Sequence, residues 1–233
     1  MHALSFAFSK KDPVTHSKIL EELRFKYEGE FFDVFMKNNS AQALENVKQE
    51  NREVLQKYWD KYESLFSSYS EPVTHTVIAH GDYRLSNLMH KVREDGTVDI
   101  KILDLQTMQG SSPVTDLLYF IFTGTDEQFR AQYYDQLIDH YYTQLHDAMK
   151  RLHLDPEKVY SRHEFDYELK EKLPLGLSIA IFALPIVTVD AENAPTMNKD
   201  LDVTEFSVTT TNDLFKERLN GVVNDYVKWG ILK

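Results

Sequence analysis

The segment IAHGDYRLSN, residues 78–87, brings together three residues that can take part in acid–base or metal chemistry. They are His80, Asp82 and Asn87, and Gly81 gives the backbone freedom between the first two. An aspartate can accept a proton, and carboxylate and amide oxygens are the ligands that Mg²⁺ prefers. An apolar segment ends where these residues begin and another starts after them, so we expect a reactive loop beside a strand.

The residues that follow predict a β-hairpin that brings another carboxylate to this loop. Apolar and charged residues alternate over 98–102, and Asp95-Gly96 is a strong signal for a hairpin turn. A two-residue turn at these positions gives a register in which Asn87 faces Asp104. Opposed residues have Cβ atoms about 4.5–5.5 Å apart, so their oxygens could bind one Mg²⁺ ion.

Asp82 and Asn87 have the spacing of the kinase catalytic loop H-R-D-x-x-x-x-N, with Gly81 in place of the arginine. In that loop the aspartate accepts the proton of the attacking hydroxyl, the asparagine holds a metal ion, and a second aspartate after the next hairpin holds metal between phosphates. Asp82, Asn87 and Asp104 match these roles. The alternative is that the first two only cap local backbone groups. The His-Gly before them, the hairpin and the LDLQ segment favour catalysis.

The neighbouring polar residues have more than one interpretation. We group His80 with Asp82 as a catalytic-loop residue, and expect it to orient the loop rather than carry a proton. Asp116, in PVTDLLYF, is either a carboxylate favoured by a helix N-terminus or a support that hydrogen-bonds the loop. Arg84 either faces solvent or meets a phosphate. Four histidines lack a convincing zinc spacing: His140, His146, His153 and His163.

Composition limits the class of protein. A chain of 233 residues can form one or two domains with a sizeable core. The formal charge of −11 opposes binding to nucleic acid. The absence of cysteine excludes disulfides, thiol catalysis and thiolate metal sites. The N-terminal sequence is not typical of a signal peptide, so we expect a cytoplasmic protein with neither a membrane nor a nucleic acid as partner.

The pattern of apolar residues predicts a mostly α-helical fold with one small β-hairpin. Helical periodicity predicts packing helices over 14–35 and 41–67. Another helix is expected to close at Gly124, and Thr125 is expected to cap the next, which runs to about Leu152.

Residues 173–189 are uncharged, at the short end of the range for a membrane span. Pro174, Gly176 and Pro185 are expected to shorten any continuous helix there, which favours a buried core helix. Two further sets are also interpreted as packing surfaces, although the aromatic set would suit a large apolar substrate as well. They are a C-terminal stripe (Phe215, Leu219, Val222, Val223, Tyr226) and an aromatic set (Tyr119, Phe120, Phe122).

Several segments together resemble the CHK-kinase-like family, the group that contains the ecdysteroid kinases, within the aminoglycoside and choline phosphotransferases. They are HGDYRLSNLM, KILDLQ, PVTDLLYFIFTGTDEQFR and LIDHYYTQL, and the resemblance extends to the C-terminal FKERLNGVVNDYVKWGIL. It implies a protein kinase-like fold and transfer of phosphate from ATP, with Mg²⁺, to the hydroxyl of a small molecule, including steroids in the insect branch. The chain departs from the family at Arg84, Ser86 and Leu105, where an aromatic residue, asparagine and phenylalanine are usual.

By this resemblance, residues 1–233 form a kinase-like C-terminal lobe. It would contain a catalytic loop at 78–90, a metal-binding segment at 100–106 and a helical substrate-side region at 115–233. HALSFAF resembles the helix at the start of that lobe, and neither a Gly-rich phosphate loop nor a strand lysine precedes it. We therefore expect the nucleotide-binding N-lobe to be absent, as in a truncated gene model, a splice product or a degenerate copy.

The sequence leaves three hypotheses for the function. The first is the catalytic half of a small-molecule kinase, the second is a noncatalytic binding or interaction module made from that half, and the third is an unrelated acidic helical adaptor. Asp82, Asn87 and Asp104 favour kinase ancestry over the adaptor. The missing lysine and glycine loop favour the noncatalytic module for the chain in isolation.

Overall fold

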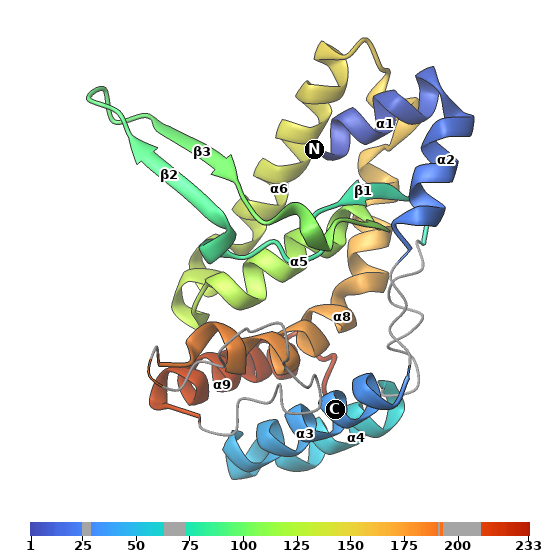
Figure 1. Cartoon of the computed structure of the whole chain (residues 1–233). Helices are drawn as coiled ribbons and strands as arrows, with labels where there is room; N and C mark the ends of the chain where they lie inside the picture. Colours follow the sequence, from blue (N-terminus) through green and yellow to red (C-terminus); the bar gives the residue numbers. More distant parts are fainter. Residues whose placement is uncertain (25–28, 63–72, 191, 193–210) are drawn as a thin grey trace.

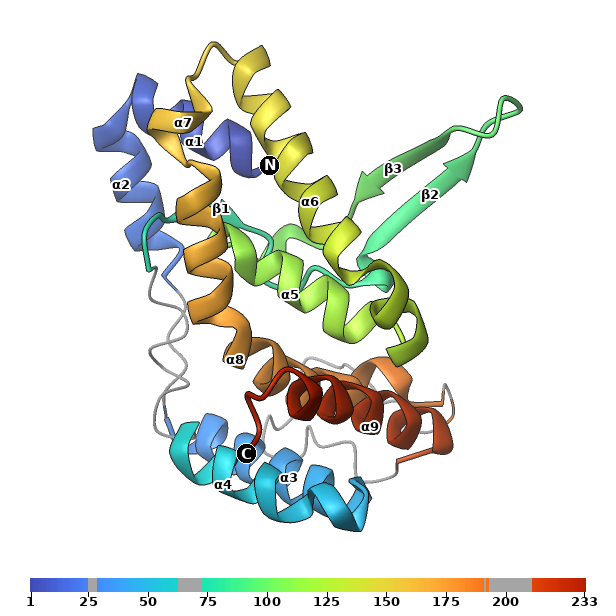
Figure 2. The ribbon, with the colours of Figure 1, turned by 180° about the vertical axis from the view of Figure 1, so that it is seen from behind.

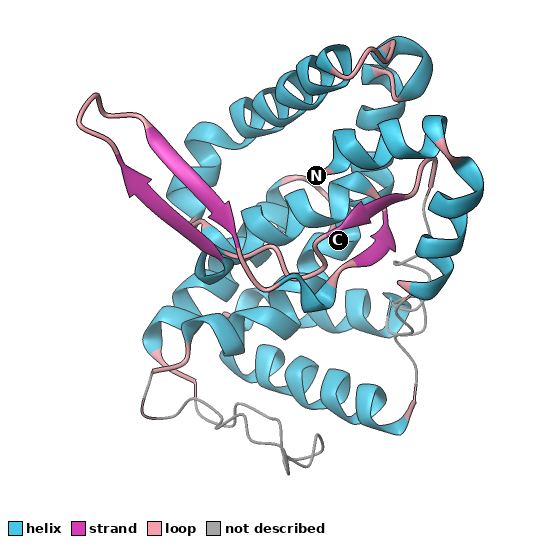
Figure 3. Cartoon of the chain, turned by 45° about the horizontal axis from the view of Figure 1, so that its top comes forward, coloured by secondary structure: helices cyan, strands magenta, loops and turns pink. Residues whose placement is uncertain are grey.

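The computed structural model describes residues 1–24, 29–62, 73–190, 192 and 211–233. This part of the chain is mostly helical, with two small pairs of strands (Figure 3), so the predicted fold class is confirmed. The helices are α1 (His2–Lys11), α2 (Pro13–Glu22), α3 (Glu30–Asn46), α4 (Arg52–Tyr62), α5 (Pro113–Gly124), α6 (Glu127–Arg151), α7 (Pro156–Val159), α8 (Arg162–Thr188) and α9 (Asp213–Lys228), with short 3₁₀ turns at Gln49–Asn51, Leu85–Asn87 and Leu105–Thr107.

Two antiparallel strand pairs frame the predicted catalytic loop. Strand β1 (Val77–Ala79) pairs with β4 (Gln109–Ser111), and β2 (Leu88–Val92) pairs with β3 (Val98–Ile102). The loop therefore begins where β1 ends. After the β2–β3 hairpin the chain returns and pairs with β1 through β4. The β2–β3 hairpin projects away from the helices (Figure 1), and nearly all of its residues are exposed on both faces.

The hairpin register differs by one residue from the prediction. The turn holds three residues rather than two, because the Arg93 N–H donates to the Thr97 carbonyl across it. Gly96 has φ +81°, the left-handed conformation with which three-residue hairpin loops end. As a result Asn87 lies opposite Leu103, whose N–H donates to its carbonyl at 2.8 Å. The predicted pairing of Asn87 with Asp104 is wrong.

The core forms where α5, α8 and α9 pack together below the loop (Figures 1 and 2). The five residues of the C-terminal stripe are completely buried, which confirms that this helix docks on the core. Tyr226 Oη donates to the Leu173 carbonyl at 2.6 Å, and a buried ion pair joins Arg130 of α6 to Asp225 of α9 at 2.6 Å. Helix α9 therefore ties α6 to α8.

Helix α8 runs without interruption through Pro174 and Pro185, so the expectation that these residues shorten it is wrong. It bends along its length (Figure 2), as helices do where a proline removes a backbone donor. Within the described residues it is the helix whose length and hydropathy would suffice to cross a membrane, and 67% of its most apolar window is buried inside the protein. This burial agrees with the prediction of a core helix.

Two predicted helices have different bounds in the structure. The helix expected over 14–35 is two helices, since α2 ends at Glu22 and α3 begins at Glu30. The helix expected over 41–67 is interrupted at Val47, which is extended. Contacts with α9 hold this break, because Asn220 accepts from the Lys48 N–H and donates to the Asn46 carbonyl. Residues 63–67 lie outside the described chain.

Thr125 is not the cap of α6. Its Oγ1 donates to the Ile121 carbonyl, so it belongs to the end of α5, and the next residue, Asp126, accepts from the Phe129 N–H at 2.7 Å. Threonine and aspartate are both common N-cap residues. Here the Thr125 hydroxyl bonds the last turn of α5, so Asp126 caps α6. The end of α6 at Arg151 agrees with the prediction.

Candidate active site

Asp116 holds the start of the catalytic loop from beneath. Its carboxylate accepts from the N–H groups of His80 (2.7 Å) and Gly81 (3.0 Å), and its Oδ2 lies 3.0 Å from Nε2 of His2. The residue is in the first turn of α5 and is 4% exposed. Of the two interpretations of Asp116, these hydrogen bonds agree with the one in which its carboxylate supports the loop.

The charge state of Asp116 results from two opposing effects. Burial alone would raise the pKa of this carboxyl, but the His2 side chain and the two backbone donors together hold the pKa below its ordinary value. Asp116 is therefore ionised and fully hydrogen-bonded, which makes it a rigid anchor for the loop.

His80 connects the loop to the end of the hairpin. The residue is completely buried, and its Nε2 lies 2.8 Å from the Leu103 carbonyl oxygen, while Nδ1 accepts from the Asp82 N–H at 3.3 Å. These partners assign the proton to Nε2. With both ring nitrogens bonded to backbone groups, the side chain is placed to orient the loop.

Gly81 allows the loop to touch the chain that follows the hairpin. Its φ of +84° is a conformation that L side chains rarely adopt, and a Cβ there would lie 2.1 Å from the carbonyl oxygen of Thr107. The Thr107 hydroxyl donates to the His80 carbonyl at 3.0 Å. The glycine in His-Gly-Asp thus has a steric reason, and Thr107 is a site residue that the sequence analysis did not identify.

Asp82, the predicted base, is fixed by two donors. Asn87 Nδ2 donates to Asp82 Oδ2 (3.0 Å) and to the Asp82 carbonyl (2.8 Å), and Arg84 Nε donates to the same Oδ2 at 3.0 Å. No described residue donates to Asp82 Oδ1, which is left free to accept a proton. Asn87 is 6% exposed, and its amide oxygen accepts no hydrogen bond from a described residue. Arg84 is therefore partner to a carboxylate, a third possibility beside the two considered from sequence.

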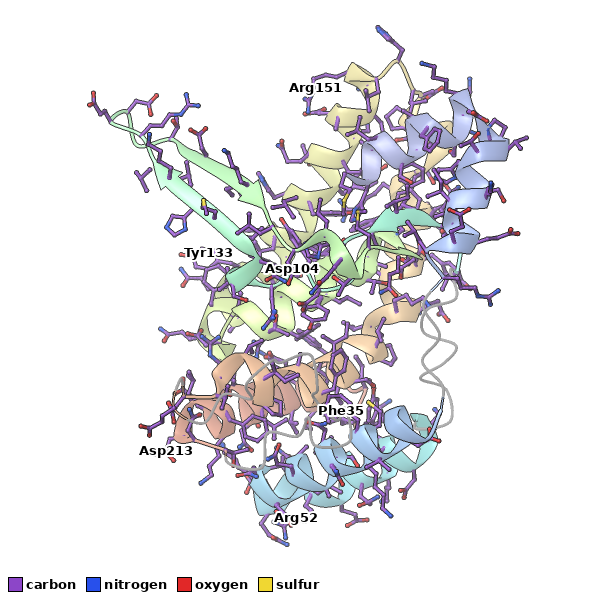
Figure 4. The ribbon with its side chains drawn as sticks, viewed as in Figure 1. Phe35, Arg52, Asp104, Tyr133, Arg151 and Asp213 are labelled. Atoms are coloured by element: carbon purple, nitrogen blue, oxygen red, sulfur yellow. The ribbon has the colours of Figure 1, made fainter. Side chains whose placement is uncertain are left out.

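Asp104 lies at the base of the hairpin, one residue beyond Leu103 (Figure 4). Its side chain is exposed, and its backbone is left-handed, with φ 60° and ψ 58°. This conformation costs free energy in a residue other than glycine and is frequent at functional sites. The structure thus places Asp104 next to Asn87 in the fold, although not directly across from it.

The donors available for a metal ion are few. Within the described residues no group of three or more histidine and acidic side chains forms a metal cluster. Mg²⁺ is commonly held by one or two protein oxygens and completed by water and substrate phosphates. The Asn87 amide oxygen and the exposed Asp104 carboxylate fit that kind of site, and their metal-binding role stays a prediction.

A pocket of about 420 Å³ opens beside the loop, within the usual volume range for small-molecule sites. Asp82 and Gly81 line it together with Leu23, Tyr119 and Phe182. The three residues of the aromatic set have different surroundings. Tyr119 lines this pocket, Phe122 is completely buried in the core, and the Phe120 ring lies 5.6 Å from the Tyr83 ring in a tilted arrangement. The pocket presents a carboxylate and apolar rings to the same ligand.

The sequence around this site matches a known protein family. A model of the ecdysteroid kinase-like family matches residues 1–154. The chain belongs to the ecdysteroid kinase-like family. The match contains the loop, the hairpin, Asp104 and Asp116 and ends after α6, so α8 and α9 lie beyond it, whereas the sequence resemblance was drawn over nearly the whole chain. Searches among curated proteins and among solved structures gave no match.

Membership of this family indicates kinase-like phosphotransferase ancestry, which agrees with the resemblance seen in the sequence. His2 is a further site residue that the sequence did not reveal. It lies 114 residues from Asp116 in the chain, and no local pattern indicates which distant carboxylate a histidine will meet.

Proposed function

We propose that this chain supplies the catalytic half of an ATP- and Mg²⁺-dependent kinase that phosphorylates a hydroxyl group of a small molecule. The observation that carries the proposal is Asp82, which lines a pocket of suitable volume with one carboxylate oxygen fixed and the other free. An acceptor hydroxyl that hydrogen-bonds this free oxygen would pass its proton to Asp82 as its oxygen bonds to the γ-phosphorus of ATP, and the bond from that phosphorus to the β,γ-bridging oxygen would break to release ADP.

The surrounding residues position the base. Asn87 and Arg84 fix the direction of the carboxylate, while Asp116 and His80 fix the backbone on which it stands. Mg²⁺ held by Asn87 and Asp104 would neutralise charge on the transferring phosphate. Positioning and electrostatic stabilisation supply most of the catalysis in phosphoryl transfer, so a preorganised loop is the main contribution of the protein.

We propose an acceptor with an apolar ring system, such as a steroid-like alcohol. Tyr119, Phe182 and Leu23 offer apolar surface near Asp82. Polar residues that include Glu22, Arg24 and Gln109 line the rest of the pocket, where they can meet the hydroxyl groups of such an acceptor. The family match supports this class of acceptor without identifying it.

The hairpin supports the view that the active enzyme has a further lobe. Met89, Val92, Val98, Ile100 and Ile102 are all more than a third exposed on it. A two-stranded hairpin is marginally stable by itself, and exposed apolar patches usually mark contact surfaces. We propose that a nucleotide-binding lobe covers this hairpin. The second candidate is a noncatalytic binding module, since the pocket beside Asp82 has the volume to hold a small molecule whether or not phosphate is transferred.

The test is transfer of labelled phosphate from ATP to a panel of steroid and amino-alcohol acceptors. Three proteins are compared: the 233-residue chain, a fusion with a family N-lobe upstream of His2, and the fusion with Asp82→Asn. We expect little turnover from the short chain and clear turnover from the fusion. Asp82→Asn should lower turnover by about 10²–10⁴-fold, because it keeps the size of the side chain and removes the base.

The matched control is Asp147→Asn in the fusion, since Asp147 is an exposed carboxylate of α6. It should leave turnover unchanged. Robust turnover by the 233-residue chain would contradict the expectation that it is nearly inactive by itself. Turnover in the Asp82→Asn fusion equal to that of the unmutated fusion would show that Asp82 is not the base. An inactive fusion that binds acceptor would favour the noncatalytic module.

A further inference from the structure

A second pocket of about 420 Å³ adjoins the catalytic loop. Its walls come from the loop residues that follow Asp82, from the ends of α5 and α8, and from the first turns of α9. Arg84 and Arg218 line it together with the hydroxyl residues Ser86 and Thr123, and Ile186 and Leu214 are among its apolar residues. Arg84 also positions Asp82, and the other residues of this pocket have no part in the proposed proton transfer.

The charge of the pocket is opposite to that of the molecule. The chain has a formal charge of −11, yet the described residues that line this pocket include two arginines and neither aspartate nor glutamate. Asp82 lies behind Arg84 and compensates it in part, whereas Arg218 has no such neighbour among the described ion pairs. Two cations facing one cavity are unfavourable unless an anion enters it.

Both arginines also have hydrogen-bond donors without a partner in the described chain. Nη1 of Arg218 is buried and has no hydrogen-bond partner within the described chain. Arg84 uses Nε for Asp82, and no described residue accepts from its two Nη groups. The Nη groups of Arg84 are partly exposed, so the cost falls on Nη1 of Arg218. A buried charged donor without an acceptor is costly and needs an explanation such as a missing ligand.

We propose that this second pocket binds the oxyanion of an amphipathic small molecule, such as a sulfate ester. Guanidinium groups recognise sulfate, phosphate and carboxylate through paired N–H donors. The Ser86 hydroxyl adds a polar group to the same cavity, whereas the Thr123 hydroxyl already donates to the Tyr119 carbonyl. Ile186 and Leu214 can cover a carbon skeleton. The inference needs neither ATP nor catalysis, so it stands apart from the proposed kinase activity.

Calorimetric titration of the 233-residue chain without ATP tests the site. The probes are 4-methylumbelliferyl sulfate, its parent 4-methylumbelliferone and inorganic sulfate. We expect the ester to bind at least about tenfold more tightly than either other probe, because it alone satisfies both the arginines and the apolar wall. Equal affinity for ester and parent would overturn the anion site. Equal affinity for ester and inorganic sulfate would overturn the amphipathic ligand.

Variants locate the binding in this pocket. Arg218→Gln should abolish the preference for the ester over the parent, whereas Arg151→Gln, at the exposed end of α6, should leave the preference unchanged. Leu214→Asp gives a second test that keeps both arginines, since it places a carboxylate at a 44% exposed position of the wall. It should also abolish the preference. Unchanged preference in Arg218→Gln or Leu214→Asp, with thermal unfolding like that of the parent chain, would refute the assignment.

Discussion

Gly81 is constrained in two ways that a side chain cannot meet. Gly81→Ala would pay about 1–2 kcal/mol for the left-handed backbone and more for displacing the Thr107 carbonyl. We expect a loss of at least about 2 kcal/mol, or a fall in Tm of roughly 4–8 °C for a chain of this size.

Gly96→Ala is the matched control for this loss. Gly96 has a similar φ, +81°, but an added Cβ would meet no described atom within 4 Å. The backbone cost of about 1–2 kcal/mol alone should lower its Tm by about 2–8 °C, and by less than in Gly81→Ala. Equal losses in the two variants, measured by thermal unfolding, would show that the contact with Thr107 does not constrain the loop.

Asp116 predicts a dependence of stability on pH. Because the folded state holds the pKa of this carboxyl below its ordinary value of 3.8, ionised Asp116 stabilises the fold above that pH. The contribution is lost as the pH falls from 3.8 through the lower pKa of the folded state. Asp116→Asn should cost about 1–3 kcal/mol near neutral pH, and the difference from the parent chain should shrink at acid pH.

Urea unfolding of both proteins between about pH 7 and about pH 3 measures this effect. A difference in free energy of unfolding that stays constant over the whole range would mean that the Asp116 carboxylate is not the group that titrates.

Single residues of the site differ in how far sequence could predict them. The spacing of Asp82 and Asn87 lies within one loop, so a local motif was sufficient to bring them together. Asp104 depends on the length of the hairpin turn, and one additional turn residue moved the register. His2 and Thr107 take part through long-range contacts, which carry no local signal.

Among the described helices, α8 contains the glycine that leaves the least room for a side chain. A Cβ on Gly176 would lie 2.5 Å from both Phe122 Cε2 and Tyr226 Oη. Helix propensity alone predicts that Gly176→Ala stabilises the chain by about 1 kcal/mol. We expect the opposite sign, a net loss of about 1–2 kcal/mol in urea unfolding, because the overlap with two buried rings costs more than the propensity gain.

Tyr226→Phe provides the companion measurement for Gly176→Ala. It removes the hydroxyl that the new methyl group would meet, so Gly176→Ala should cost less in the Tyr226→Phe background than in the parent chain. Additive effects of the two substitutions would argue against direct contact, and stabilisation by Gly176→Ala would show that α5 and α9 move aside.

Tertiary contacts explain the elements that periodicity placed wrongly. Helical spacing continues through Val47, but Asn220 satisfies the backbone on both sides of that residue and makes the interruption favourable. The prolines of α8 act in the opposite way, since burial against α5 and α9 keeps the helix continuous where local preference would end it. The C-terminal stripe was predictable because its spacing and its burial agree.

Across the whole molecule, the family match and the two pockets divide the chain differently. The matched residues 1–154 contain Asp82, Asn87, Asp104 and Asp116. Helices α8 and α9 lie outside the match and contribute Phe182 to the first pocket and Arg218 to the second. The predicted site residues thus come from the matched part, and residues beyond it complete the walls of both pockets.

The ion pair between Arg130 and Asp225 has a consequence for synthesis on the ribosome. The two residues are 95 positions apart, so at the usual rate of elongation α6 waits roughly 5–20 s for its partner. During that interval the guanidinium of Arg130 lacks its carboxylate, and the surface that α9 will cover remains open to water. The rate of translation therefore sets the earliest time at which α9 can cover this surface and the core can close.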